Sequence, residues 1–91
     1  MQTELEPKTK TLKPIYANIV FREQPSALAF AKLVVEHDWT VGVAYVPNRG
    51  QWQATVRRRI HPVFHEVTVW LATLTARATP MGGELDGWGH G

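Results

Sequence analysis

Residues 40–60 read TVGVAYVPNRGQWQATVRRRI, and this stretch decides the fold. Its first part, 41–46, is rich in β-branched and aromatic residues and is too short for a typical helix. A proline, an asparagine and a glycine then supply turn geometry within 47–50. After the turn, apolar and polar residues alternate with the period of a strand. The pattern predicts a hairpin in which 40–47 pairs with 51–60.

The segments on both sides of the hairpin complete the fold. Alternation predicts a strand over 15–22, and helical spacing predicts a helix over 25–37 with a proline in its first turn. Helical spacing returns over 64–79, and a glycine pair ends that helix before a short edge strand at 84–88. The order β-α-β-β-α-β predicts an α+β, ferredoxin-like sandwich, in which both helices cover one face of a four-stranded antiparallel sheet.

One hydrophobic core is expected between the sheet and the two helices. The strand positions that face the helices and the apolar stripes of the helices should meet there. The predicted members of this core are Ile19, Phe21, Leu28, Ala31, Val35, Val43, Trp52, Val56, Val67, Leu71 and Leu74.

The composition allows one small globular domain, because the chain has 91 residues of which 44% are apolar and 20% charged. We expect that domain over 14–91 and a flexible N-terminal arm over 1–13, which lacks apolar periodicity. The absence of cysteine excludes disulfides, thiolate zinc sites, iron–sulfur clusters and cysteine nucleophiles. Because no long apolar run is present, we expect no signal peptide, no membrane helix and a cytoplasmic location.

Few residues have the spacing that metal binding or catalysis requires. His61 and His65 are four apart, but a proline lies between them where a strand passes into a helix, so no metal site is expected. The only serine, Ser26, has the place of a helix cap. Glu84 and Asp86 could form a carboxylate pair for acid–base chemistry, but ion pairs with arginines of neighbouring strands are the favoured interpretation. The sequence therefore predicts a protein that is not an enzyme and uses no cofactor.

Three consecutive arginines end the second strand of the hairpin. In a strand, Arg57 and Arg59 share the open face of the sheet, while Arg58 points the other way. This basic face suggests a nucleic-acid-binding module as one function. Sheets that read RNA stack bases on aromatic side chains of the central strands, whereas this strand offers Gln53 and Thr55 there. Nucleic-acid binding is therefore the alternative rather than the favoured function.

The most distinctive segment is GGELDGWG, residues 82–89. Its first two glycines permit the left-handed turn that ends a helix. Gly87 lets another backbone come close, and Trp88 carries a large amphipathic ring. Two interpretations of Trp88 are open: an exposed anchor for a partner, or a core side chain.

Set after the preceding segments, this ending resembles a known family. The similarity runs through WQATVRRRI at 52–60, a proline at 62, TVW at 68–70 and GELDGWG at 83–89, and it extends over about 15–89. The chain resembles the bacterial regulator of ribonuclease E activity B family, whose members inhibit that endoribonuclease.

The resemblance implies a ferredoxin-like fold and a small non-catalytic regulatory protein. The implied partner is a protein, ribonuclease E or another RNA-processing enzyme. The ending Asp86, Gly87 and Trp88 is the candidate partner-binding site, and Arg57 and Arg59 are added to it from the basic face.

Overall fold

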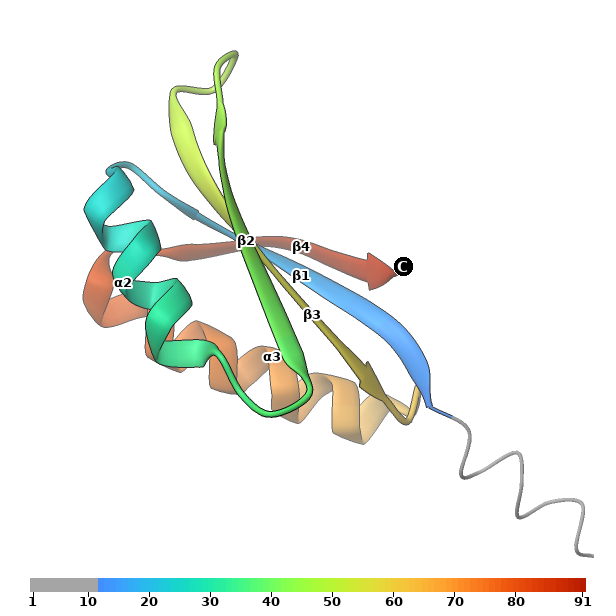
Figure 1. Ribbon diagram of the computed structural model, residues 1–91. Helices are drawn as coiled ribbons and strands as arrows, with labels where there is room; N and C mark the ends of the chain where they lie inside the picture. Colours follow the sequence, from blue (N-terminus) through green and yellow to red (C-terminus); the bar gives the residue numbers. More distant parts are fainter. Residues whose placement is uncertain (1–11) are drawn as a thin grey trace, which may run out of the picture.

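The computed structural model describes residues 12–91, shown in Figure 1. The predicted arm over 1–13 therefore lies outside the described residues, except for its last two residues. The elements follow the order β1 (Lys13–Phe21), α2 (Gln24–Val34), β2 (Trp39–Val46), β3 (Gln51–Ile60), α3 (Phe64–Ala78), the 3-10 turn η2 (Thr79–Met81) and β4 (Glu84–His90). This order confirms the α+β fold with β-α-β-β-α-β connectivity.

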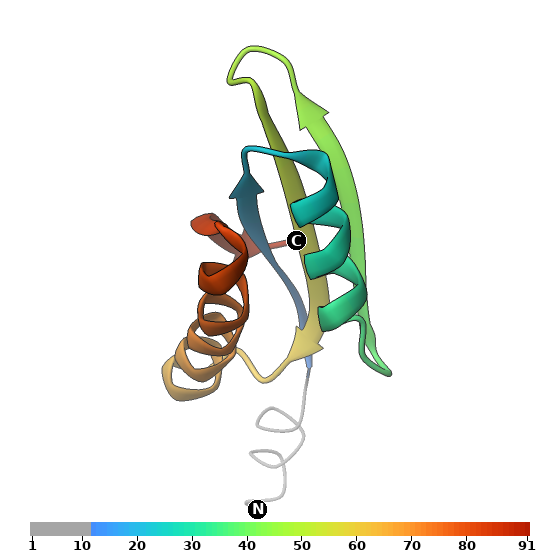
Figure 2. The ribbon, with the colours of Figure 1, turned by 90° about the vertical axis from the view of Figure 1, so that its left-hand side faces the viewer.

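The four strands form one antiparallel sheet in the order β2-β3-β1-β4. The two strands that carry fully shielded side chains, β1 and β3, lie in the middle, where Ala17 is opposite Val56. The predicted hairpin is present, with β2 paired to β3 across the turn. Figure 2 shows both helices on the same side of this sheet. None of the helices within residues 12–91 is both long and apolar enough to cross a membrane.

The core lies between the sheet and the helices. Alternate residues of β1 and β3 are buried, because a strand presents every second side chain to the same face. The rings of Phe21 and Phe30 pack with their centroids 5.3 Å apart within this layer. The predicted core residues Ile19, Phe21, Val56, Val67 and Leu74 are buried, and Val43, Trp52 and Leu71 pack against them partly buried.

The predicted buried face of α2 was wrong. Leu28 and Val35 are exposed, whereas Ala27, Phe30 and Val34 are buried. Both sets have helical spacing, so periodicity alone does not choose between them. Side-chain size decides which set is buried. The large Phe30 ring packs against Phe21, and this contact turns the face with Ala27, Phe30 and Val34 towards the sheet. The expected core member Ala31 is consequently only half buried. The helix also ends at Val34 rather than at residue 37, because Val35 takes an extended backbone conformation.

Glycine is required at both positions before β4, but for a different structural reason at each. Gly82 has φ of 82°, the left-handed conformation expected for the end of a helix. A Cβ on Gly83 would lie 2.5 Å from a ring carbon of Phe21, so only glycine fits against that buried ring. The path from α3 into β4 is therefore set by this close approach.

Strand β4 contains a bulge at Asp86. Leu85 is opposite Ile19 and Gly87 is opposite Asn18, so Asp86 has no cross-strand partner of its own. The strict alternation assumed for 84–88 was wrong, and Glu84 and Asp86 do not form a regular same-face pair. The strand also runs two residues further, to His90.

Candidate binding surfaces

Trp88 lies on the helix side of the sheet, at its edge. It is opposite Ala17, a fully buried residue that faces the helices. The bulge is the cause, because the extra residue brings Leu85 and Trp88, three apart, to the same face. Leu85 packs against the core, while Trp88 lies beyond it and remains 45% exposed. The position is that of an edge residue, not of a core tryptophan.

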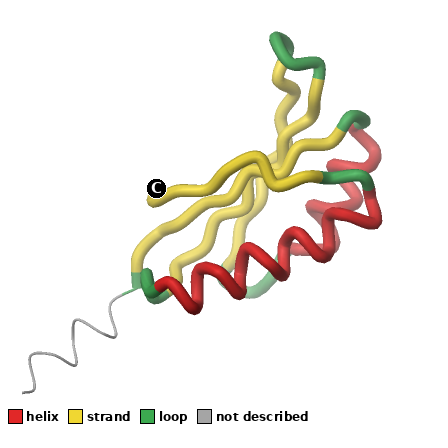
Figure 3. The backbone as a smooth tube through the Cα atoms, turned by 180° about the vertical axis from the view of Figure 1, so that it is seen from behind, coloured by secondary structure: helices red, strands yellow, loops and turns green. Residues whose placement is uncertain are grey.

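An apolar groove lies beside Trp88. The turn η2 joins α3 to β4. Figures 1 and 3 both show that α3 and β4 lie close together at this turn and spread apart towards their other ends. The side chains there enclose about 390 Å³, and we call this hollow the α3–β4 groove. Phe64 at the start of α3 is 86% exposed, and the rings of Trp88 and His90 lie 5.9 Å apart. The groove is lined by Pro62, Val63, Phe64, Val67, Thr68, Leu71, Ala72, Thr75, Trp88 and His90.

Asp86 is held by an arginine from the turn of the hairpin. Arg49 donates two hydrogen bonds to its carboxylate, from Nη1 to Oδ2 at 3.0 Å and from Nη2 to Oδ1 at 3.2 Å. These bonds lower the pKa of Asp86 below its ordinary value and raise that of Arg49. Asp86 thus forms the ion pair that the sequence favoured, but with a turn residue rather than with an arginine of a neighbouring strand.

The open face of the sheet carries the basic residues. Arg57 is opposite Tyr16 and Arg59 is opposite Pro14, so both point away from the helices, as predicted, and both are exposed. The Tyr16 ring lies over Gly89 of β4, where an added Cβ would be 2.9 Å from the tyrosine hydroxyl oxygen. Arg57 and Arg59 therefore lie on a different face from the α3–β4 groove, and the structure does not bring them together with Trp88.

A polar network occupies the middle of that open face. The Thr55 hydroxyl donates to Oδ1 of Asn18 at 2.8 Å, and the Gln53 amide nitrogen donates to the Thr55 hydroxyl at 3.4 Å. Among the open-face residues of the central strands β1 and β3, Tyr16 is the one aromatic side chain. Paired aromatic platforms for stacked bases are thus missing from this part of the described sheet.

The regulator of ribonuclease activity B family model matches residues 9–90. The match covers nearly the whole chain, including every strand and both helices described above. The chain belongs to this family. No curated protein and no solved structure matches it.

Membership in the regulator of ribonuclease activity B family gives a coarse function. The family is described by its regulation of ribonuclease activity, which is a regulatory rather than a catalytic role. The matched range contains the α3–β4 groove and the Asp86–Arg49 ion pair. Within residues 12–91, no group of three or more His, Asp or Glu side chains is placed to hold a metal ion.

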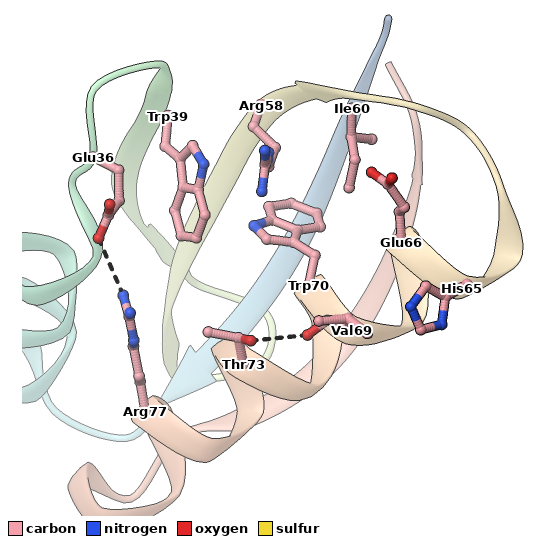
Figure 4. A pocket seen from close by; sticks show the side chains of 10 residues that line it. All are labelled: Glu36, Trp39, Arg58, Ile60, His65, Glu66, Val69, Trp70, Thr73 and Arg77. Atoms are coloured by element: carbon pink, nitrogen blue, oxygen red, sulfur yellow. Dashed lines mark hydrogen bonds and ion pairs between the residues drawn. The ribbon is translucent and has the colours of Figure 1, made fainter. Parts of the chain in front are cut away.

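This family member has a second hollow, which the sequence did not predict. Arg58 points towards the helices and lies over the Trp39 ring, with its guanidinium carbon 5.0 Å from the ring centroid. Trp39 in turn meets Trp70 of α3 edge-to-face, at 5.9 Å and 86°. The orientation of Arg58 follows from alternation, but its neighbours come from separate elements and no local pattern joins them. Figure 4 shows this group of side chains around the hollow.

Proposed function

We propose that this member of the regulator of ribonuclease activity B family is a non-catalytic protein that binds a ribonuclease and inhibits it. The partner would be ribonuclease E or another RNA-processing enzyme, which also implies a cytoplasmic location. The family description supports regulation of a ribonuclease. The α3–β4 groove, with its exposed apolar lining, supports regulation through protein contact.

The groove is suited to an apolar segment of the partner. Trp88 and Phe64 are exposed aromatic side chains, the type that contributes most at protein interfaces because a rigid ring buries a large area. His90 is the one ionisable residue of the lining, so a partner would remove little charge from water there. We therefore assign the groove to an apolar protein segment rather than to RNA.

The proposed roles of Asp86 and Gly87 follow from their places beside Trp88. Asp86 shapes the strand, since its bulge and its ion pair with Arg49 orient the residues that follow. Gly87 has nothing within 4 Å of the position of a Cβ, so a partner backbone can come close to β4.

Nucleic-acid binding by the open face is the second candidate, and the exposed Arg57 and Arg59 favour it. The polar network of Asn18 and Thr55 at the centre of that face provides no stacking surface. Binding through the α3–β4 groove therefore ranks first.

The experiment measures cleavage of a model RNA by purified ribonuclease E, together with its affinity for this protein. Phe64→Ser is the informative variant, because a side chain that is 86% exposed can be replaced with little effect on stability. Leu33→Ser is the matched control, since Leu33 is an exposed apolar residue of α2 outside the groove. We expect Phe64→Ser to weaken both binding and inhibition, and Leu33→Ser to change neither. Equal inhibition by both variants would contradict this use of the groove.

A further inference from the structure

The hollow around Arg58 lies on the other side of α3 from the α3–β4 groove. It lies between the start of β2, the end of β3 and α3, and it has a volume of about 430 Å³. We call it the Trp39–Trp70 cleft, after the two indoles that form its wall. On α3, Val69 and Trp70 face this cleft, whereas Thr68 and Leu71 face the groove. The two hollows are therefore separate surfaces.

Within residues 12–91, two buried hydrogen-bond donors of the Trp39–Trp70 cleft have no acceptor. Trp70 is only 3% exposed, and its indole Nε1 has no hydrogen-bond partner among residues 12–91. Arg58 Nε is likewise shielded and unpaired within that range. Each group can only donate, and a buried donor without an acceptor destabilises the protein. Both donors belong to residues that contact the same ring, Trp39.

Charge limits what could satisfy these donors. Glu36 is paired with Arg77 at 3.4 Å, which leaves the Arg58 guanidinium as the positive group without a carboxylate partner in the described part of the cleft. Glu66 also lines the cleft, so its carboxylate and that of Glu36 would repel a doubly charged phosphate more strongly than a singly charged group. The apolar part of the lining consists of the two indoles, Ile60 and Val69, and the polar side chains of His65 and Thr73 also line the cleft.

We propose that the Trp39–Trp70 cleft binds a carboxylate carried on an apolar stem. The Arg58 guanidinium and the Trp70 indole N–H donate to the carboxylate oxygens, and the stem packs against Trp39 and Val69. The long Arg58 side chain changes rotamer to admit the ligand to the shielded indole nitrogen. Such a carboxylate is carried either by a small free acid or by a glutamate side chain of a peptide.

The test follows the indole N–H resonance of Trp70 by NMR, because this proton is itself the proposed donor. The probes are 3-phenylpropionate, its neutral amide, and the peptide acetyl-Ala-Glu-Ala-amide. We expect one or both carboxylates to shift the Trp70 resonance at millimolar concentration, and the amide to leave it in place. Binding of 3-phenylpropionate alone would identify a small-molecule site, and binding of the peptide would identify an acidic side chain as the ligand.

Two variants with the same change of charge separate the site from general electrostatics. Arg58→Gln removes a donor of the cleft, and we expect it to weaken carboxylate binding by about tenfold or more, the loss of a charge-assisted hydrogen bond. Arg59→Gln is the control, because Arg59 points to the open face. Thermal melting verifies that both variants fold.

Three results would overturn the proposal. The Trp70 resonance could remain in place with both carboxylates, the amide could shift it equally, or Arg59→Gln could weaken binding as much as Arg58→Gln. A resonance that responds to Glu66→Gln but to no probe would show that the indole is satisfied from within the chain.

Discussion

Arg49 and Asp86 form a two-point ion pair although 37 residues separate them in the sequence. The pair joins the turn of the β2–β3 hairpin to the bulge of β4, across the width of the sheet. It therefore couples the strand that carries Trp88 to the hairpin, at a point where β4 is not held by regular pairing.

This ion pair predicts a pH dependence with a definite sign. The pKa of Asp86 is lowered in the folded protein, chiefly by the hydrogen bonds from Arg49. The contribution of the pair to stability is therefore present above the unfolded pKa of about 3.9 and lost as pH falls through the folded pKa. Because both side chains are partly exposed, the effect should be small. The melting temperatures of wild type and Arg49→Gln should differ at neutral pH and become equal in acid. If the difference in melting temperature stays the same in acid, the ion pair is not its cause.

Two glycines of the C-terminal segment predict opposite results on substitution. Gly83→Ala forces a methyl group into the Phe21 ring and should lower the free energy of unfolding by about 1–3 kcal/mol, as overpacking does. Gly87→Ala meets no atom within 4 Å and should change stability by about 0.5 kcal/mol or less. Urea unfolding measures both, and equal losses would contradict the close packing at Gly83.

The buried faces of α2 and α3 predict an ordered series of leucine substitutions. Leu74 is fully buried, so Leu74→Ala should cost about 2–5 kcal/mol through lost burial and the cavity left behind. Leu71→Ala should cost less, because Leu71 is only partly buried beside the core. The exposed Leu28 should tolerate alanine with a change of about 0.5 kcal/mol. A loss at Leu28 as large as that at Leu74 would contradict the position of α2.

Trp88→Ala separates binding from folding. With Trp88 45% exposed, we expect a loss of about 2 kcal/mol or more in partner binding, within the usual hot-spot range, and a smaller loss of stability. Calorimetry with the purified ribonuclease and urea unfolding give the two quantities. A stability loss of about 3–5 kcal/mol with unchanged binding by the folded fraction would make Trp88 a folding residue instead.

The open-face arginines predict a negative result. We expect no tight RNA complex near physiological salt, measured by the anisotropy of a labelled RNA. If RNA does bind this face, replacing Arg57 and Arg59 together should reduce the salt dependence by about two units in the log–log slope. A sub-micromolar complex with that signature would reverse the ranking of the two functions.

Strand alternation and turn residues were enough to predict most of the fold. The hairpin over 40–60 was predicted to within a residue, because a central strand buried on one face alternates strictly. The buried face of α2 was not predicted correctly, because two sets of apolar residues both have helical spacing. Only the contact between Phe30 and Phe21 decides which set faces the sheet. Local pattern does not contain that contact.

The candidate sites depended even more on distant contacts. Trp88 was singled out from the sequence, but its face was not, because a bulge changes the alternation and leaves no clear local signal. The Trp39–Trp70 cleft brings together residues from three elements, so its two donors, unpaired in the described part of the chain, became visible only in three dimensions.

The bulge at Asp86 also makes the β4 edge a poorer template for self-association. β4 is an edge strand, and a flat edge is a template on which further copies can add as strands. An extra residue without a partner interrupts that template just before Trp88. Deleting Asp86 would restore a continuous edge and would keep Leu85 and Trp88, then two positions apart, on the same face. The irregular strand thus leaves the Trp88 ring exposed at the border of the sheet, beside an edge that is poorly suited to the addition of further strands.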